Sequence, residues 1–180
     1  MKSKIPDYAF LFLISGSIIF FDQLTKWLVR VNLAPEEIWA PWAWLLPYAR
    51  IVNWHNTGIA LGLFQNKNIL IIILAFLVSI GIIYYFPKVP RVDLFLRIAL
   101  AMQLGGAIGN MIDRVYQGHV TDFISLGPFP VFNVADSSIS IGVVVLLVGV
   151  YIMDTKKKKP EQTSEPDQDD GTGKPVEKTE

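Results

Sequence analysis

The chain has 180 residues, of which 52% are hydrophobic, and its formal net charge at pH 7 is +0. A neutral chain gives no electrostatic argument for a nucleic-acid partner, and the absence of cysteine excludes disulfides, thiolate nucleophiles and cysteine-based metal sites. The apolar residues are concentrated in runs of about 20, which is the length that crosses a bilayer as a helix. We therefore expect a single-domain, mainly α-helical membrane protein.

Four apolar runs predict four transmembrane helices, over about residues 8–29, 69–86, 94–112 and 136–153. The first run follows Lys2 and Lys4 and could be read as a secretory signal peptide. No small-x-small cleavage signal comes after Phe21, however, and the helical pattern continues through Asp22 and Lys26. We expect this first helix to be retained.

The segment between the first two spans, residues 30–68, is more than a connector. It carries aromatic residues of the kind that favour a membrane interface, namely Trp39, Trp42, Trp44, Tyr48 and Trp54. From Ala49 to Phe64 the pattern is typical of short strands around the turn Asn56-Thr57-Gly58. We therefore expect a small strand-rich cradle between helices 1 and 2, and the alternative is a flexible interfacial loop.

Basic residues indicate the orientation of the four spans. One set of termini and loops carries Lys2, Lys4, Lys88, Arg91, Arg97 and the lysines at 156–159, whereas the opposite set carries only Arg30, Arg50, Lys67 and Arg114. The positive-inside rule then places both termini in the cytoplasm. Residues 30–68 and 114–135 are the segments expected to face outward.

The end of the chain differs in composition from the rest. Residues 155–180 are rich in Pro, Glu, Asp, Thr and Lys and contain almost no large apolar side chain. Such a segment cannot bury a core. We expect a disordered, charged cytoplasmic tail after a membrane-embedded domain at residues 1–154.

Polar residues from three of the predicted spans reach a similar depth. With a rise of 1.5 Å per residue, Asp22 lies roughly 20 Å and Lys26 roughly 27 Å above the cytoplasmic end of the first helix, and Asn110 and Asp113 lie about 24 and 28 Å up the third. Asp136 stands at the outer end of the fourth. Because ionisable residues inside a membrane usually face the bundle interior or a watery cavity, we expect one shared site near the outer face.

Each of these residues also has a purely structural interpretation. Asp22 and Lys26 are spaced i, i+4 and can form an ion pair on one helix face. Arg114 can extend its charge to the interface, and Asn133 or Asp136 can cap the fourth helix. Capping alone does not explain the second aspartate, Asp122, in the same outward segment.

Two carboxyl groups at one depth suggest an aspartate dyad. Like charges held close together share a proton, so the ionised partner can activate water while the protonated partner polarises a carbonyl. This chemistry is peptide hydrolysis without a cofactor, a metal or a covalent intermediate.

Three alternatives compete with the dyad. Ser137 or Ser138 with buried Lys26 could form a serine–lysine hydrolase. A zinc protease would need a clustered motif that the two histidines, His55 and His119, do not supply. A small membrane transporter or assembly factor would be expected to place its polar site near mid-membrane, often in repeated halves, and no repeat is visible.

Several motifs, in order, resemble those of the lipoprotein signal peptidase (signal peptidase II) family, a group of bacterial membrane aspartyl proteases. They are Asn110-Met111-Ile112-Asp113-Arg114, Val120-Thr121-Asp122-Phe123 and Phe132-Asn133-Val134-Ala135-Asp136, preceded by Asp22-Gln23-Leu24-Thr25-Lys26 and Asn56-Thr57-Gly58-Ile59-Ala60. The resemblance extends over about residues 8–153. Any one motif would be weak, but several in the right order are specific.

The resemblance implies an enzyme of the bacterial cytoplasmic (inner) membrane, with its active site near the outer face. Its partners would be membrane lipid and a prolipoprotein carrying diacylglycerol on a cysteine, cleaved just before that cysteine, and we expect a monomer. By matching motifs, Asp122 and Asp136 would be the catalytic pair. The supporting or substrate-binding residues would be Asn110, Asp113, Arg114, Asn133, Asn56, Asp22 and Lys26.

Overall fold

A computed structural model of the chain describes residues 5–58 and 67–158. In this part of the chain, four helices are long and apolar enough to cross a membrane. They are α1 (Ile5–Asn32), α2 (Asn68–Tyr85), α3 (Leu94–Gln117) and α4 (Val134–Lys158). The four-helix prediction is confirmed.

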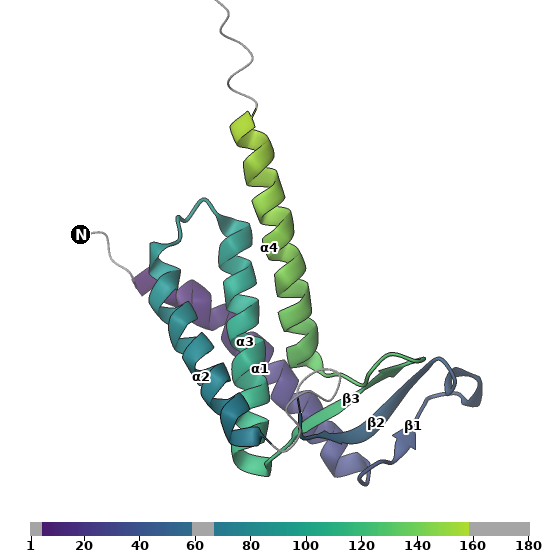
Figure 1. Ribbon diagram of the computed structural model, residues 1–180. Helices are drawn as coiled ribbons and strands as arrows, with labels where there is room; N and C mark the ends of the chain where they lie inside the picture. Colours follow the sequence, from purple (N-terminus) through teal and green to yellow (C-terminus); the bar gives the residue numbers. More distant parts are fainter. Residues whose placement is uncertain (1–4, 59–66, 159–180) are drawn as a thin grey trace, which may run out of the picture.

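The helices pack into a bundle whose two ends differ (Figure 1). The N-terminal end of α1 and the C-terminal end of α4 lie at one end, here called the terminal end. A small sheet lies at the opposite end, here called the sheet end, where α1 and α3 finish and α4 begins. A short 3-10 helix, η3 (Phe86–Lys88), follows α2 at the terminal end.

Helix α3 is the central element of the bundle. It packs against each of the other three helices, and glycines on its surface make the closest approaches possible. A Cβ on Gly105 would lie 2.8 Å from the Ile18 Cβ of α1, and a Cβ on Gly106 would lie 2.5 Å from the Ala135 carbonyl oxygen of α4. The small residues thus bring α1 and α4 against α3.

The sheet has three antiparallel strands in the order β1-β2-β3, formed by β1 (Ile38–Trp39), β2 (Ala49–Asn56) and β3 (Val120–Leu126). A short 3-10 helix, η1 (Ala43–Leu45), lies between β1 and β2. Strand β3 comes from the connection between α3 and α4, so the sheet joins the two segments expected to face outward. A register shift between Ile51 and Trp54 marks a bulge in β2.

Two of the predicted boundaries need correction. Helix α3 ends at Gln117 rather than near Ile112, so Asp113 and Arg114 are helical. Helix α4 continues to Lys158, past the expected start of the tail at residue 155. Strand β2 pairs with β1 and also with β3, from the distant segment. The strand expected at residues 59–64 and the expected tail at residues 159–180 lie outside the described residues.

Candidate active site

Asp122 lies in β3, where sequence patterning predicted only an outward segment. Its side chain is buried, with 1% of its surface exposed. The Asn56 side chain at the end of β2 donates a hydrogen bond to Asp122 Oδ2 at 2.8 Å, and Asn133 Nδ2 donates to Asp122 Oδ1 at 2.6 Å. The carboxyl group is therefore held on both oxygens by neutral amides.

Asp136 lies in the first turn of α4 and forms a reciprocal cap with Asn133. The Asp136 backbone N–H donates to Asn133 Oδ1 at 2.9 Å, and the Asn133 backbone N–H donates to Asp136 Oδ2 at 3.3 Å. This is the arrangement of a capping box, with an aspartate in the place of the usual glutamate. Asn133 is thus the N-cap of α4 and Asp136 is its capping-box partner. Asp136 has a further contact, because its Oδ1 also accepts from Asn110 Nδ2 at 2.7 Å.

Two asparagines connect the two aspartates. Asn133 Nδ2 donates both to Asp122 and to Asn110 Oδ1, the latter at 3.1 Å, and Asn110 in turn donates to Asp136. The residues come from α3, β3 and the start of α4. The structure therefore brings Asp122, Asp136, Asn110, Asn133 and Asn56 into one cluster at the sheet end, as expected from the sequence.

Burial and a like charge perturb the titration of Asp122. Desolvation is the main cause that raises the pKa of its carboxyl to about 7, and the negative charge of Asp136 adds to it. Other groups oppose this shift by lowering the pKa, namely the amide hydrogen bonds from Asn56 and Asn133 and the positive charge of Lys26. Near neutral pH, Asp122 can hold a proton that an ordinary aspartate would have lost.

Behind the aspartates lies a fully buried ion network. Lys26 Nζ is 2.8 Å from Asp22 Oδ2 and 3.1 Å from Asp113 Oδ2, and all three side chains have 0% exposure. Lys26 also donates to Asn110 Oδ1 at 2.9 Å. The expected Asp22–Lys26 pair is confirmed, but it forms one part of a larger network that reaches the asparagine bridge.

The two network aspartates hold the backbone beside the two candidate catalytic residues. Asp22 Oδ1 accepts a hydrogen bond from the backbone N–H of Ala135, which precedes Asp136, at 2.9 Å. Asp113 Oδ2 accepts from the backbone N–H of Thr121, which precedes Asp122, at 3.1 Å. Lys26 thus neutralises two carboxylates whose positions set the start of α4 and the path of β3.

Arg114 connects the end of α3 to the turn after β2. Its Nη2 donates to the Gly58 carbonyl oxygen at 2.8 Å, and its Nη1 donates to the Asn110 carbonyl oxygen at 3.3 Å. The side chain is buried rather than extended to the interface. Gly109, one turn before Asp113, leaves the space that Asp22 needs, because a Cβ there would lie 2.7 Å from Asp22 Oδ2.

Two supporting residues were not among the candidates predicted from the sequence. Gln23 Nε2 donates to the Gly109 carbonyl oxygen at 3.0 Å and to Asp113 Oδ1 at 3.1 Å. Arg30 Nη1 donates to Thr121 Oγ1 at 3.2 Å and lies 3.7 Å from Asp113 Oδ1. A glutamine within an apolar span is the signal that could have identified Gln23, whereas Arg30 looks like any basic residue at the end of a span.

The serine–lysine alternative does not fit the geometry. The Ser137 hydroxyl donates to the Asn133 carbonyl oxygen at 2.9 Å, and the Ser138 hydroxyl donates to the Met102 carbonyl oxygen at 2.8 Å. Lys26 is occupied by Asp22, Asp113 and Asn110. Both serines act as hydrogen-bonding residues of the first turns of α4.

Comparison with known proteins identifies the family. The profile of the family described as "Signal peptidase (SPase) II" matches residues 14–152. The lipoprotein signal peptidases of two Staphylococcus aureus strains, MRSA252 and JH9, are each 32% identical over 155 residues, which covers 83% of this chain and 92% of each relative. A bacterial membrane enzyme solved by the in meso method at 2.3 Å superposes with a TM-score of 0.76 at 31% identity, covering 86% of this chain and 94% of that one. The chain therefore belongs to the signal peptidase II family, as an aspartic-type peptidase that crosses the bacterial inner membrane several times.

Proposed function

We propose that this enzyme removes the signal peptide from prolipoproteins that carry diacylglycerol on a cysteine, cleaving just before that cysteine with water activated by Asp122 and Asp136. The observation that carries the proposal is the asparagine-bridged pair of aspartates, one of them buried with a pKa raised to about 7. The family membership supplies the class of reaction and substrate.

The different environments of the two aspartates assign their roles. Asp122 holds the shared proton and donates a hydrogen bond to the scissile carbonyl oxygen, while the Asp136 carboxylate takes a proton from the attacking water. The water oxygen forms the new bond to the carbonyl carbon. Collapse of the tetrahedral intermediate breaks the C–N bond, and the proton held by Asp136 passes to the leaving amine.

Substitution of each aspartate by asparagine tests the dyad. Asparagine keeps the shape of the side chain but cannot transfer the proton, so Asp122→Asn and Asp136→Asn should each lower turnover by about 10²–10⁴-fold or more. The double variant should be no worse than either single variant, because groups that act as a unit are non-additive. Chelators and serine reagents should have no effect.

Helix capping makes the contrasting prediction for Asp136. Asparagine at position 136 would keep a side-chain oxygen that can accept from the Asn133 backbone N–H, so a residue needed only for the capping box would tolerate Asp136→Asn with turnover unchanged. The measurement is cleavage of a lipidated prolipoprotein by each purified variant in detergent. Near-normal turnover by either variant would remove that aspartate from the mechanism.

The proposed membrane orientation places both termini in the cytoplasm and the sheet end at the outer face. The N-terminal end of α1 and the C-terminal end of α4 lie at one end of the bundle (Figure 1), and the distribution of basic residues selects the cytoplasm for that end. Because the chain has no cysteine, single cysteines at Lys67 and Lys158 can report the side directly. In intact cells an impermeant thiol reagent should label position 67 and not position 158, and the reverse pattern would invert the orientation.

A further inference from the structure

The sheet has a second recess that the dyad does not use. On β3, Thr121 points to the opposite face of the sheet from Asp122, because side chains alternate along a strand. On the Thr121 side, the end of α1 lies beside a pocket of about 420 Å³, which is within the ordinary range of small-molecule sites. Its lining includes Arg30, Asn53, His55, Gln117 and His119.

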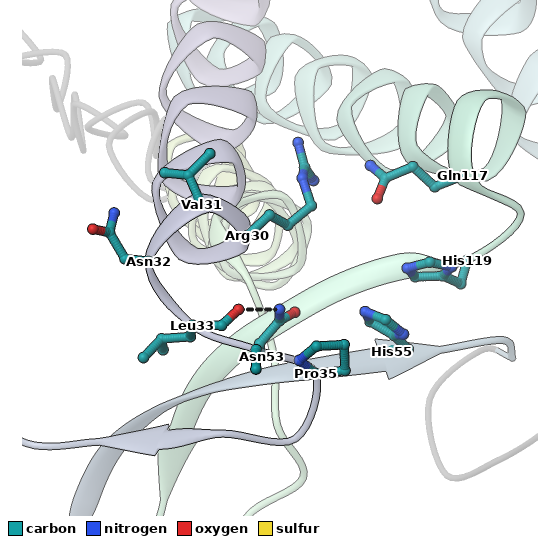
Figure 2. A pocket seen from close by; sticks show the side chains of 10 residues that line it. Arg30, Val31, Asn32, Leu33, Pro35, Asn53, His55, Gln117 and His119 are labelled. Atoms are coloured by element: carbon teal, nitrogen blue, oxygen red, sulfur yellow. Dashed lines mark hydrogen bonds between the residues drawn. The ribbon is translucent and has the colours of Figure 1, made fainter.

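Figure 2 shows how these side chains surround the pocket. The imidazoles of His55 and His119 lie against each other, with ring centroids 3.9 Å apart. Arg30 and Gln117 lie across the hollow from Asn53 and Pro35 (Figure 2). The described residues that line the pocket include no acidic side chain. Arg30, whose side chain is 25% exposed, gives the pocket its formal positive charge.

Two buried polar atoms of the pocket residues are unsatisfied. Asn53 has 3% of its surface exposed and donates from Nδ2 to the Leu33 carbonyl oxygen at 2.9 Å (Figure 2), but its Oδ1 has no hydrogen-bond partner among the described residues. The Nε2 atom of His119 is also buried without a partner there. Since buried polar groups are normally paired, a pocket with two such atoms beside a guanidinium is suited to a ligand with an anionic group and hydrogen-bonding groups next to it.

An apolar groove of about 520 Å³ adjoins this polar pocket. The two share Asn32 and Leu33 in their linings, and the groove continues along Thr25, Leu28 and Val29 of α1, with Trp39, Ile51 and Phe123 of the sheet on its other side. Thr25, Leu28 and Val29 lie deeper in the span than Arg30. The recess is therefore polar at the end of the helix and apolar toward the membrane interior.

We propose that this recess binds one membrane phospholipid, with its phosphate at Arg30, a hydrogen-bond-donating headgroup at Asn53 and His119, and an acyl chain along the groove. The polarity of the recess follows the direction of a lipid in the bilayer, with the headgroup at the surface and the chain inside. Arg30 also donates to Thr121 Oγ1 at 3.2 Å. A phosphate bound to Arg30 would therefore hold in place a side chain that contacts β3, the strand that carries Asp122. This site is separate from the substrate site over the dyad.

The choice of headgroup follows from the unsatisfied atoms. A glycerol headgroup carries hydroxyls beyond its phosphate, and these can pair with Asn53 Oδ1 and His119 Nε2. A choline headgroup carries the same phosphate but no N–H or O–H. Phosphatidylglycerol should therefore be retained about tenfold more strongly than phosphatidylcholine.

Native mass spectrometry of the purified full-length protein, incubated with equal amounts of the two lipids, tests the proposal. One phosphatidylglycerol should remain bound to the wild-type protein. Leu28→Trp should fill the groove and Arg30→Gln should remove the charge at the phosphate, so each should reduce retention at least about fivefold. The matched control is Leu24→Trp, which changes an exposed leucine on the same helix that lines neither the pocket nor the groove, and it should behave as wild type.

The same experiment can overturn the assignment. Equal retention of both lipids would contradict the headgroup assignment. Equal retention by wild type, Leu28→Trp and Arg30→Gln would show that lipid binds elsewhere on the helices. Excess inorganic phosphate should not displace the phospholipid, because it cannot occupy the groove. Displacement by phosphate alone would make the pocket a free-anion site and would contradict the lipid proposal.

Discussion

The two ends of the bundle each contain a cluster of charged side chains, but the clusters are built differently. At the terminal end, Asp7 accepts from Arg91 Nε at 3.0 Å and from Arg97 Nη2 at 2.9 Å. The guanidinium of Arg97 also lies over the rings of Phe10 and Phe86, with distances to the ring centroids of 5.3 and 4.5 Å. One carboxylate thus meets two arginines, and the cluster connects α1 to the loop between α2 and α3 and to the start of α3.

At the sheet end, carboxyl groups outnumber the cations in direct contact with them. Lys26 forms ion pairs with both Asp22 and Asp113, while Asp122 and Asp136 accept hydrogen bonds from neutral asparagine amides. A cluster with matched opposite charges stabilises ionised groups, whereas a buried carboxyl group beside a like charge can keep a proton near neutral pH. The difference in charge balance is what separates a structural clamp from a site suited to acid–base chemistry.

The largest effect is expected from Lys26→Met. This change leaves Asp22 and Asp113 without their shared cation in a fully buried site, and breaking a buried pair in this way costs about 3–5 kcal/mol. Both aspartates hold backbone beside the dyad, so turnover should be lost as well. Thermal unfolding and cleavage assays in detergent measure the two effects, and unchanged values for both would contradict the role of the network.

A smaller, pH-dependent effect is expected from Asp122→Asn. The pKa of Asp122 is about 7 in the folded protein and 3.8 in the reference state, so the folded state binds the extra proton between those pH values. Wild-type stability should therefore fall as pH rises through that window, by at most about 4 kcal/mol. Asparagine does not titrate, so the melting temperature of Asp122→Asn minus that of wild type should increase from pH 4 to pH 8.

A constant difference in melting temperature across this pH range would contradict the raised pKa. The matched control is Asn133→Ala, which removes a donor to Asp122 but leaves its carboxyl group in place. The control should retain the pH dependence even though it is destabilised. Only removal of the Asp122 carboxyl itself should abolish this part of the pH dependence.

Arg97→Met at the terminal end should have a still smaller effect, limited to stability. Asp7 keeps its contacts with Arg91, and methionine retains part of the packing against Phe10 and Phe86. We expect a lower melting temperature than wild type, but a smaller loss than for Lys26→Met, and kcat per folded molecule should be unchanged. A selective fall in kcat without a fall in stability would show that the two ends are functionally coupled.

The smallest effect is expected beyond the terminal end. The composition of residues 160–180 predicts a segment without a packed core, so a truncation after Lys159 should still insert and cleave substrate at the wild-type rate. The measurement is cleavage by membranes that contain equal amounts of the two proteins. Loss of cleavage by correctly inserted truncated enzyme would assign this segment a part in the activity.

Several properties of this protein could be determined from the sequence by itself. The four spans follow from local apolar runs, because each helix satisfies its own backbone and its burial in lipid does not depend on a particular partner. The i, i+4 spacing of Asp22 and Lys26 predicted their ion pair for the same local reason. The ordered motifs further identified Asp122, Asp136 and their neighbours as a candidate site.

Only the tertiary structure decided how those residues are joined. Sequence patterning predicted strands around the turn Asn56-Thr57-Gly58, but it did not predict the pairing of β2 with β3, which lies more than 60 residues later in the chain. The bridge through Asn110 and Asn133, and the contacts of Asp22 with Ala135 and of Asp113 with Thr121, likewise join distant segments. Such contacts depend on how α3 packs against α1 and α4, and local hydropathy carries no information about that packing.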